Sequence, residues 1–117
     1  MKNPKVVGVV FTTAMDDARF NLIAKALADP QRFAILQRIA RQDDCPCMAL
    51  VDECSITQAT ISHHLKELAG ADLITARREG KCGYFTLRAE TLGAYQAELS
   101  RRLLSGSEAG AAKGRTV

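Results

Sequence analysis

The stretch Ser55-Ile-Thr-Gln-Ala-Thr-Ile-Ser-His-His-Leu-Lys-Glu-Leu-Ala-Gly-Ala-Asp72 organises the rest of the chain. At about 100° per residue, Ile61, Leu65 and Leu68 fall on one narrow stripe, which predicts a helix anchored to a core. The opposite face carries short or polar side chains and no acid until Glu67. Such a face can approach base edges and phosphates in a DNA groove. An ordinary solvated helix face is the alternative interpretation of this stretch alone.

The residues after this helix favour DNA binding. The segment 73–79, which begins with the apolar pair Leu73-Ile74, leads to the turn residues Gly80-Lys81-Cys82-Gly83, and the run 84–87 returns. This pattern predicts a hairpin with a basic tip. A groove-compatible helix followed by a basic hairpin is the winged helix-turn-helix arrangement, in which the hairpin straddles phosphates. The predicted contacts with a double-stranded DNA operator are Gln58, Thr60, Ser62, His63, Lys66, Arg77, Arg78 and Lys81.

Composition limits the other possibilities. The chain has 117 residues, 47% of them hydrophobic and only 5% aromatic, which suits one small domain of packed helices. Its net charge of +3 requires any nucleic-acid surface to be local, and a domain of this size often doubles itself. No nucleotide-binding glycine loop or converging pair of acids is present, so an enzyme is the least favoured class.

We expect the chain to divide into an N-terminal arm over residues 1–15, a domain over 16–104 and a disordered tail over 105–117. The apolar run 6–11 in the arm is too short for a secretory signal, and nothing approaches the length of a membrane span. We therefore expect a cytoplasmic protein without a membrane partner. In that compartment the four cysteines are thiols or ligands rather than disulfides.

The domain is expected to be mostly helical, with about five helices and the small hairpin. Asp16 and Asp17 begin the first helix, and Asp29-Pro30 caps and starts the second. The second helix is expected to bury Phe33, Leu36, Ile39 and Ala40. A short helix follows Pro46, and the last begins near residue 88. We expect a homodimer through the first and last helices, with the interface residues Phe20, Leu92, Tyr95, Leu99 and Leu103.

Three segments together resemble ArsR/SmtB-type repressors. Residues 27–36 (LADPQRFAIL) resemble the second-helix signature of this family, and residues 60–68 (TISHHLKEL) resemble its recognition helix. Residues 71–74 (ADLI), 78–81 (REGK) and 84–85 (YF) resemble its wing. The resemblance covers residues 20–100 or so in the right order. It implies a homodimeric winged-helix repressor that leaves its operator when an effector, such as a metal ion, arsenite or an oxidant, binds.

The resemblance also draws attention to Cys45-Pro46-Cys47, because the arsenic- and metal-sensing branch often carries Cys-x-Cys at this place. The pair precedes a helix whose positive end is expected to lower the thiol pKa. A thiophilic metal ion or As(III) bound at Cys45 and Cys47 is the leading effector, with no cofactor required. Redox sensing by the same thiols, and an interaction domain without metal sensing, are the alternatives.

The remaining candidate ligands are less favourable. Cys54 lies roughly 10 Å of helical rise beyond Cys47, too far to share one ion with it. Cys82 is expected to be an exposed residue of the hairpin tip. His63 and His64 are adjacent and point in different directions, so His63 is a DNA candidate and His64 a packing residue. The family's other metal site uses acids and histidines of the last helix, which here offers Glu90 and Glu98 but no histidine.

Overall fold

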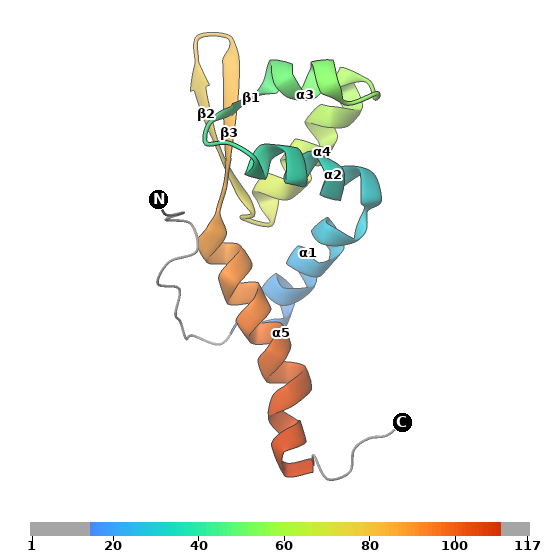
Figure 1. The fold of residues 1–117 in the computed structure, drawn as a ribbon, viewed down its shortest axis with the longest axis vertical. Helices are drawn as coiled ribbons and strands as arrows, with labels where there is room; N and C mark the ends of the chain where they lie inside the picture. Colours follow the sequence, from blue (N-terminus) through green and yellow to red (C-terminus); the bar gives the residue numbers. More distant parts are fainter. Residues whose placement is uncertain (1–14, 111–117) are drawn as a thin grey trace.

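The computed structural model describes residues 15–110, which form five helices and a small antiparallel sheet (Figure 1). The described elements are α1 (Asp17–Ala28), α2 (Pro30–Ala40), β1 (Cys45–Pro46), α3 (Cys47–Glu53), α4 (Gln58–Gly70), β2 (Ile74–Glu79), β3 (Cys82–Leu87) and α5 (Ala89–Gly110). The predicted fold class, mostly helical with a winged helix-turn-helix, is confirmed. Within the described range, no helix combines the length and apolar composition needed to cross a membrane.

The N-terminal ends of three helices follow directly from the residues that precede them. The Asp16 carboxylate accepts the backbone N–H of Arg19 at 2.8 Å, and the Asp29 carboxylate accepts the N–H groups of Gln31 and Arg32. Thr57 caps α4 in the same way by accepting the backbone N–H of Thr60 at 3.2 Å. These bonds satisfy amide groups that a helix cannot satisfy internally.

The sheet has the strand order β1-β3-β2, with both pairs antiparallel. β2 and β3 form the predicted hairpin around the two-residue turn Gly80-Lys81, in which Gly80 has a φ of +62°. A side chain at that position would be strained, so glycine fits the turn. β1 was not predicted from the sequence. It places Cys45 opposite Phe85 and Pro46 opposite Tyr84, and so joins the segment before α3 to the wing.

The core gathers between α2, α3, α4 and the sheet, where Ile35, Ile39, Leu50, Ile61 and Leu68 are almost fully buried. The predicted stripe of α4 is thus confirmed. The predicted stripe of α2 is wrong in part, because Ala40 is exposed and the side chain of Phe33 is 42% exposed. The buried face is formed by Ile35, Leu36 and Ile39, and Phe33 lies well around the helix from it at 100° per residue.

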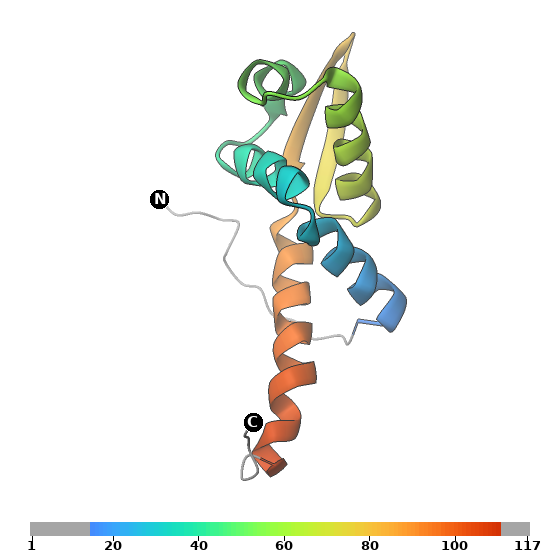
Figure 2. The same ribbon diagram turned by 90° about the vertical axis from the view of Figure 1, so that its right-hand side faces the viewer.

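The last helix extends away from the other elements. α1 lies beside α5 as far as Arg102, which pairs with Asp17, and the last turns of α5 project beyond the rest of the described chain in both views (Figures 1 and 2). We expected the tail to begin at residue 105, but α5 continues to Gly110. The rest of the expected tail and the expected arm up to residue 14 lie outside the described residues.

Candidate nucleic-acid interface and cysteine site

Helix α4 presents a polar face to solvent, as the sequence predicted. Gln58, Ser62, His63 and Lys66 are exposed, while the apolar stripe on the other side is buried. Thr60 differs from the other candidates, because it is half-buried and its hydroxyl lies 3.0 Å from the Thr57 hydroxyl. The hydroxyl of Thr60 thus accepts a hydrogen bond from the hydroxyl of Thr57, the residue that caps the helix.

His64 points to the opposite side of α4 from this face and is only 4% exposed. Its Nε2 lies 3.0 Å from Oε1 of Gln31, so a hydrogen bond joins α4 to the start of α2. Burial lowers the pKa of His64, and the nearby cation of Arg32 adds to this effect, against the opposing charge of Asp29. His64 is thus a packing residue, as expected, although its partner lies on another helix rather than nearby in sequence.

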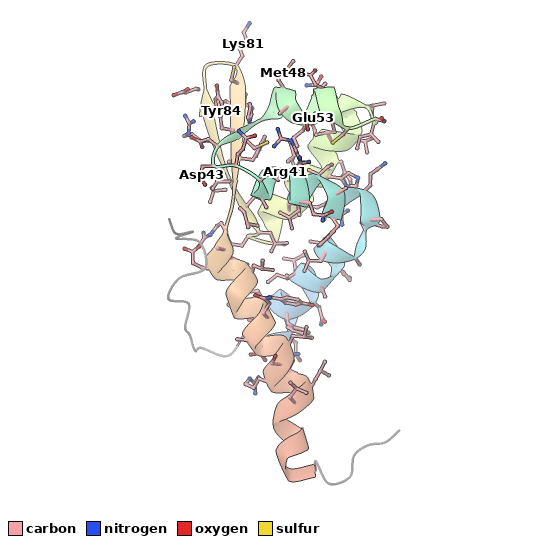
Figure 3. The ribbon with its side chains drawn as sticks, in the orientation of Figure 1. Arg41, Asp43, Met48, Glu53, Lys81 and Tyr84 are labelled. Atoms are coloured by element: carbon pink, nitrogen blue, oxygen red, sulfur yellow. The ribbon has the colours of Figure 1, made fainter. Side chains whose placement is uncertain are left out.

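The three wing cations have different surroundings. Arg77 is paired with Asp44 and with Glu79, each at 3.0 Å, and its guanidinium lies over the ring of Tyr84 at 4.6 Å. Arg78 and Lys81 are exposed, and within residues 15–110 no ion pair is found for either. Lys81 projects from the tip of the hairpin, away from the other labelled residues (Figure 3).

Charge compensation therefore divides the predicted phosphate contacts. If Arg77 bound a DNA phosphate, it would lose its contacts with two carboxylates. Arg78 and Lys81 have no such contacts to lose, so their charge can neutralise DNA phosphates directly. The sequence could not show this difference, because Asp44 lies 33 residues before Arg77.

Cys45 and Cys47 have contrasting environments. Cys45 is fully buried in β1, with its Sγ 3.7 Å from Nη1 of Arg38. Burial raises the pKa of the Cys45 thiol, and the positive charge of Arg38 only partly opposes this. The expectation of a lowered thiol pKa is therefore wrong at Cys45, because desolvation outweighs the local positive potential. Cys47 is the first residue of α3 and is half-buried.

Arg38 also fixes the position of α3 relative to α2. Its guanidinium donates to both carboxylate oxygens of Glu53, at 2.8 and 3.2 Å, and to Oε1 of Gln42 at 2.9 Å. Figure 3 shows Glu53 on α3 above Arg41, which lies at the C-terminal end of α2. The guanidinium thus holds together the elements that enclose the Cys45 thiol.

All four cysteines have free thiols, with Cys54 half-buried and Cys82 exposed as expected. In the described part of the chain, no group of three or more His, Cys, Asp or Glu side chains is arranged to hold a metal ion. Sulfur donors suit a thiophilic ion. Binding one ion at both Cys45 and Cys47 would require Cys45 to leave the core.

The predicted interface residues divide between contacts within the chain and exposure to solvent. The rings of Phe20 and Tyr95 stack with centroids 5.0 Å apart and join α1 to α5, while Leu92 is half-buried. Leu99 and Leu103 are 37% and 68% exposed. The exposed pair leaves an apolar strip on α5 that leads from the segment beside α1 toward the projecting end of the helix.

Comparison with known proteins adds to these observations. The helix-turn-helix domain family matches residues 27–77. The arsenical resistance operon repressor of Staphylococcus xylosus is 33% identical over 78 residues, which cover 67% of this chain and 74% of the relative. The arsenical resistance operon repressor of Bacillus subtilis is 30% identical over 90 residues, covering 72% and 86%. An ArsR-like transcriptional regulator from Rhodococcus sp. RHA1 has a similar fold, with a TM-score of 0.61, 22% identity and coverage of 79% and 92%.

Proposed function

This chain belongs to the ArsR family of DNA-binding transcriptional repressors, and we propose that a thiophilic metalloid or metal ion binding at Cys45 and Cys47 releases it from its operator. Its relatives and fold are those of transcriptional regulators and not of enzymes. One observation carries the proposal: the strand that contains Cys45 pairs with a strand of the wing.

We propose that α4 contacts the bases of the operator and that the wing contacts its phosphates. The exposed residues Gln58, Ser62 and His63 face bases, with Thr60 at the edge of the same surface. Lys66, Arg78 and Lys81 contact phosphates, and Arg77 contributes less because two carboxylates compensate its charge. The acid-poor exposed face of α4 supports this assignment.

We propose further that the repressor is a homodimer whose interface includes the projecting part of α5. Leu99 and Leu103 supply the exposed apolar strip, while Phe20, Tyr95 and Leu92 support α5 from within the chain. Because Leu103 is 68% exposed and Leu99 only 37%, covering them with a second copy would contribute about 1–2 kcal/mol from Leu103 and about 0.5–1 kcal/mol from Leu99. Leu99→Asp is expected to give monomers in analytical ultracentrifugation and to abolish operator binding. A variant that remains dimeric would contradict the assignment.

The effector site is coupled to DNA binding through the sheet. Arsenous acid would form an As–S bond with each of the two thiols and release one water molecule for each bond. Because Cys45 is buried opposite Phe85 of β3, its recruitment would separate β1 from the wing and displace the start of α3. A coupling free energy of about 1–3 kcal/mol between the two binding events is enough to change operator occupancy strongly.

The names of the relatives support arsenite as the first effector to test. The DNA upstream of the chain's own gene is the probe in a mobility-shift assay, with arsenite, antimonite, zinc, cadmium and peroxide added in turn. We expect arsenite or antimonite to release the wild type but not Cys45→Ala/Cys47→Ser, in which alanine keeps the buried position apolar. Cys82→Ser, at the exposed turn, is the matched control and is expected to respond like the wild type.

Two outcomes would contradict the proposal. Release of the double variant at the wild-type arsenite concentration would place the effector site elsewhere. Release of the wild type by peroxide alone would instead identify a thiol-based redox regulator, which is the second candidate function. That second function would depend on the same two thiols, of which Cys47 is half-buried and Cys45 is buried.

A further inference from the structure

Asp72 occupies the turn between α4 and β2 and has a φ of +63°. This left-handed conformation is strained for a residue with a Cβ atom, although aspartate tolerates it better than most residues do. Its backbone N–H donates to the carbonyl of Ala69 at 2.9 Å and so closes the last turn of α4. A glycine would fit the same backbone without strain, so the reason for an aspartate lies in its side chain.

The carboxylate of Asp72 accepts hydrogen bonds from two other helices and from the residue before α5. Oδ2 accepts from Nη2 of Arg19 on α1 at 3.0 Å and from the hydroxyl of Thr91 on α5 at 3.2 Å. Oδ1 accepts from Nη1 of Arg88, which directly precedes α5, at 3.3 Å. Thr91 is 3% exposed, so one of the three donors is in the interior.

The backbone beside Asp72 reinforces this junction. The N–H of Arg88 donates to the carbonyl of Leu73 at 2.8 Å, and Leu73 and Ile74 are buried. The C-terminal end of α4 is therefore attached to the N-terminal parts of α1 and α5. Each partly exposed ion pair contributes little to the free energy of folding. Three donors on one carboxylate, however, fix both the distance and the relative orientation of the elements that carry them.

We infer that Asp72 is a positioning residue that sets the orientation of the recognition helix relative to α1 and α5. This inference rests on the proposed function, because α1 and α5 connect the two copies of the proposed dimer. In such a dimer, the orientation of α4 decides the distance between the two DNA half-sites that the protein prefers.

The geometry of α4 makes this orientation consequential. A helix of 13 residues is roughly 20 Å long, so a change of about 10° at Asp72 moves its far end by roughly 3.4 Å. That displacement is about one base-pair step along DNA. The residues proposed to read bases lie toward that far end, and small losses of order at Asp72 are therefore amplified where the DNA is contacted.

The first test compares the wild type with Asp72→Gly, which fits the backbone but lacks the carboxylate, and with Asp72→Asn, which keeps an acceptor without the charge. Fluorescence anisotropy measures binding to duplexes whose half-sites are moved apart one base pair at a time, and to a single half-site. We expect the wild type to prefer one spacing by about tenfold, Asp72→Gly to lower that preference to about threefold or less, and Asp72→Asn to fall between them. Half-site affinity is expected to remain within about twofold.

An unchanged spacing preference in Asp72→Gly would overturn the inference. An equal loss of affinity for every duplex, including the half-site, would also overturn it, because it would indicate general destabilisation. Circular dichroism checks that each variant is folded. Thr91→Val removes only the buried donor and is expected to lower the spacing preference in the same direction, but less than Asp72→Gly does.

A second measurement needs no DNA. Spin labels are introduced as unnatural amino acids at Ser62 on α4 and Gln96 on α5, both exposed, and the labelled chain is diluted with unlabelled chain. Pulsed electron resonance is expected to give one narrow distance distribution for the wild type and a broader or shifted one for Asp72→Gly. Identical distributions would overturn the inference. A wild type that binds no DNA would contradict the proposed function alone, and this measurement would still decide the role of Asp72.

Discussion

The free charges of the wing give the most direct prediction. Replacing Arg78 and Lys81 together with glutamine removes two exposed cations that have no ion pair among the described residues. Each lost phosphate contact is expected to lower the slope of log affinity against log salt by about 0.9, or roughly 3.6 for a dimer that loses four contacts. The ratio of wild-type affinity to variant affinity for DNA should then fall roughly 150-fold between 50 and 200 mM salt.

Arg77→Gln is the informative comparison. The Asp44 and Glu79 carboxylates already hold the Arg77 guanidinium, and their hydrogen bonds raise its pKa further. Releasing it onto a phosphate exchanges one anionic partner for another. We therefore expect Arg77→Gln to lower the slope by less than about 0.9 per chain. Arg101→Gln, on the helix that extends away from the sheet, is the control for loss of charge and is expected to leave the slope unchanged (Figure 1).

The assay is an anisotropy titration of a labelled upstream duplex over a series of salt concentrations. Ion-pair geometry is the basis of the expected order, in which the double variant changes the slope most, Arg77→Gln less and Arg101→Gln not at all. A slope as steep for the double variant as for the wild type would refute the assignment of the wing. An effect of Arg77→Gln as large as that of either free cation would refute the argument from charge compensation.

Three further predictions concern stability. Leu68→Ala, at a fully buried position of α4, is expected to lower the free energy of unfolding by about 2–5 kcal/mol in urea, and a loss below about 1 kcal/mol would contradict its place in the core. Burial lowers the pKa of His64, so its neutral form is favoured in the folded state. The free energy of unfolding of the wild type should therefore fall, relative to that of His64→Asn, as the pH drops below 6.5. Parallel plots of unfolding free energy against pH for the two proteins would contradict this. Hydrogen bonds from Arg101 and Arg102 lower the pKa of Glu98 to about 2. Its contribution to the free energy of unfolding is therefore complete above pH 4.5 and is lost as the pH falls toward 2. Glu98→Gln should remove that part of the acid unfolding transition, and an unaltered transition would count against this role.

The helices and the hairpin were predictable because their signals are local. Asp29-Pro30 defines a helix start because the aspartate side chain caps the helix and the proline ring suits its first position. Gly80 defines a turn because glycine readily adopts the positive φ that the turn requires. The apolar spacing of Ile61, Leu65 and Leu68 likewise fixes which side of α4 is buried. The exposed polar face of the recognition helix followed from the same pattern.

The features that sequence analysis missed depend on partners far along the chain. β1 has only two residues, one of them proline, and exists because β3 passes beside it about 40 residues later. The pairing of Arg77 with Asp44 is a consequence of that contact. The burial of Cys45 reversed the expected direction of its pKa shift, because desolvation of the thiol outweighs the opposing positive charge of Arg38.

The complete burial of Cys45 also has a kinetic consequence. Under the proposed mechanism, an effector would reach this buried thiol only after β1 separates from β3. The rate of release from DNA would then rise in proportion to effector concentration only while binding of the effector to the exposed thiol is slower than the re-pairing of β1 with β3. At higher concentrations the rate reaches a ceiling equal to the opening rate of the strand. The lag before transcription begins would thus have a minimum set by the stability of two residue pairs, independent of how tightly the thiols hold the ion.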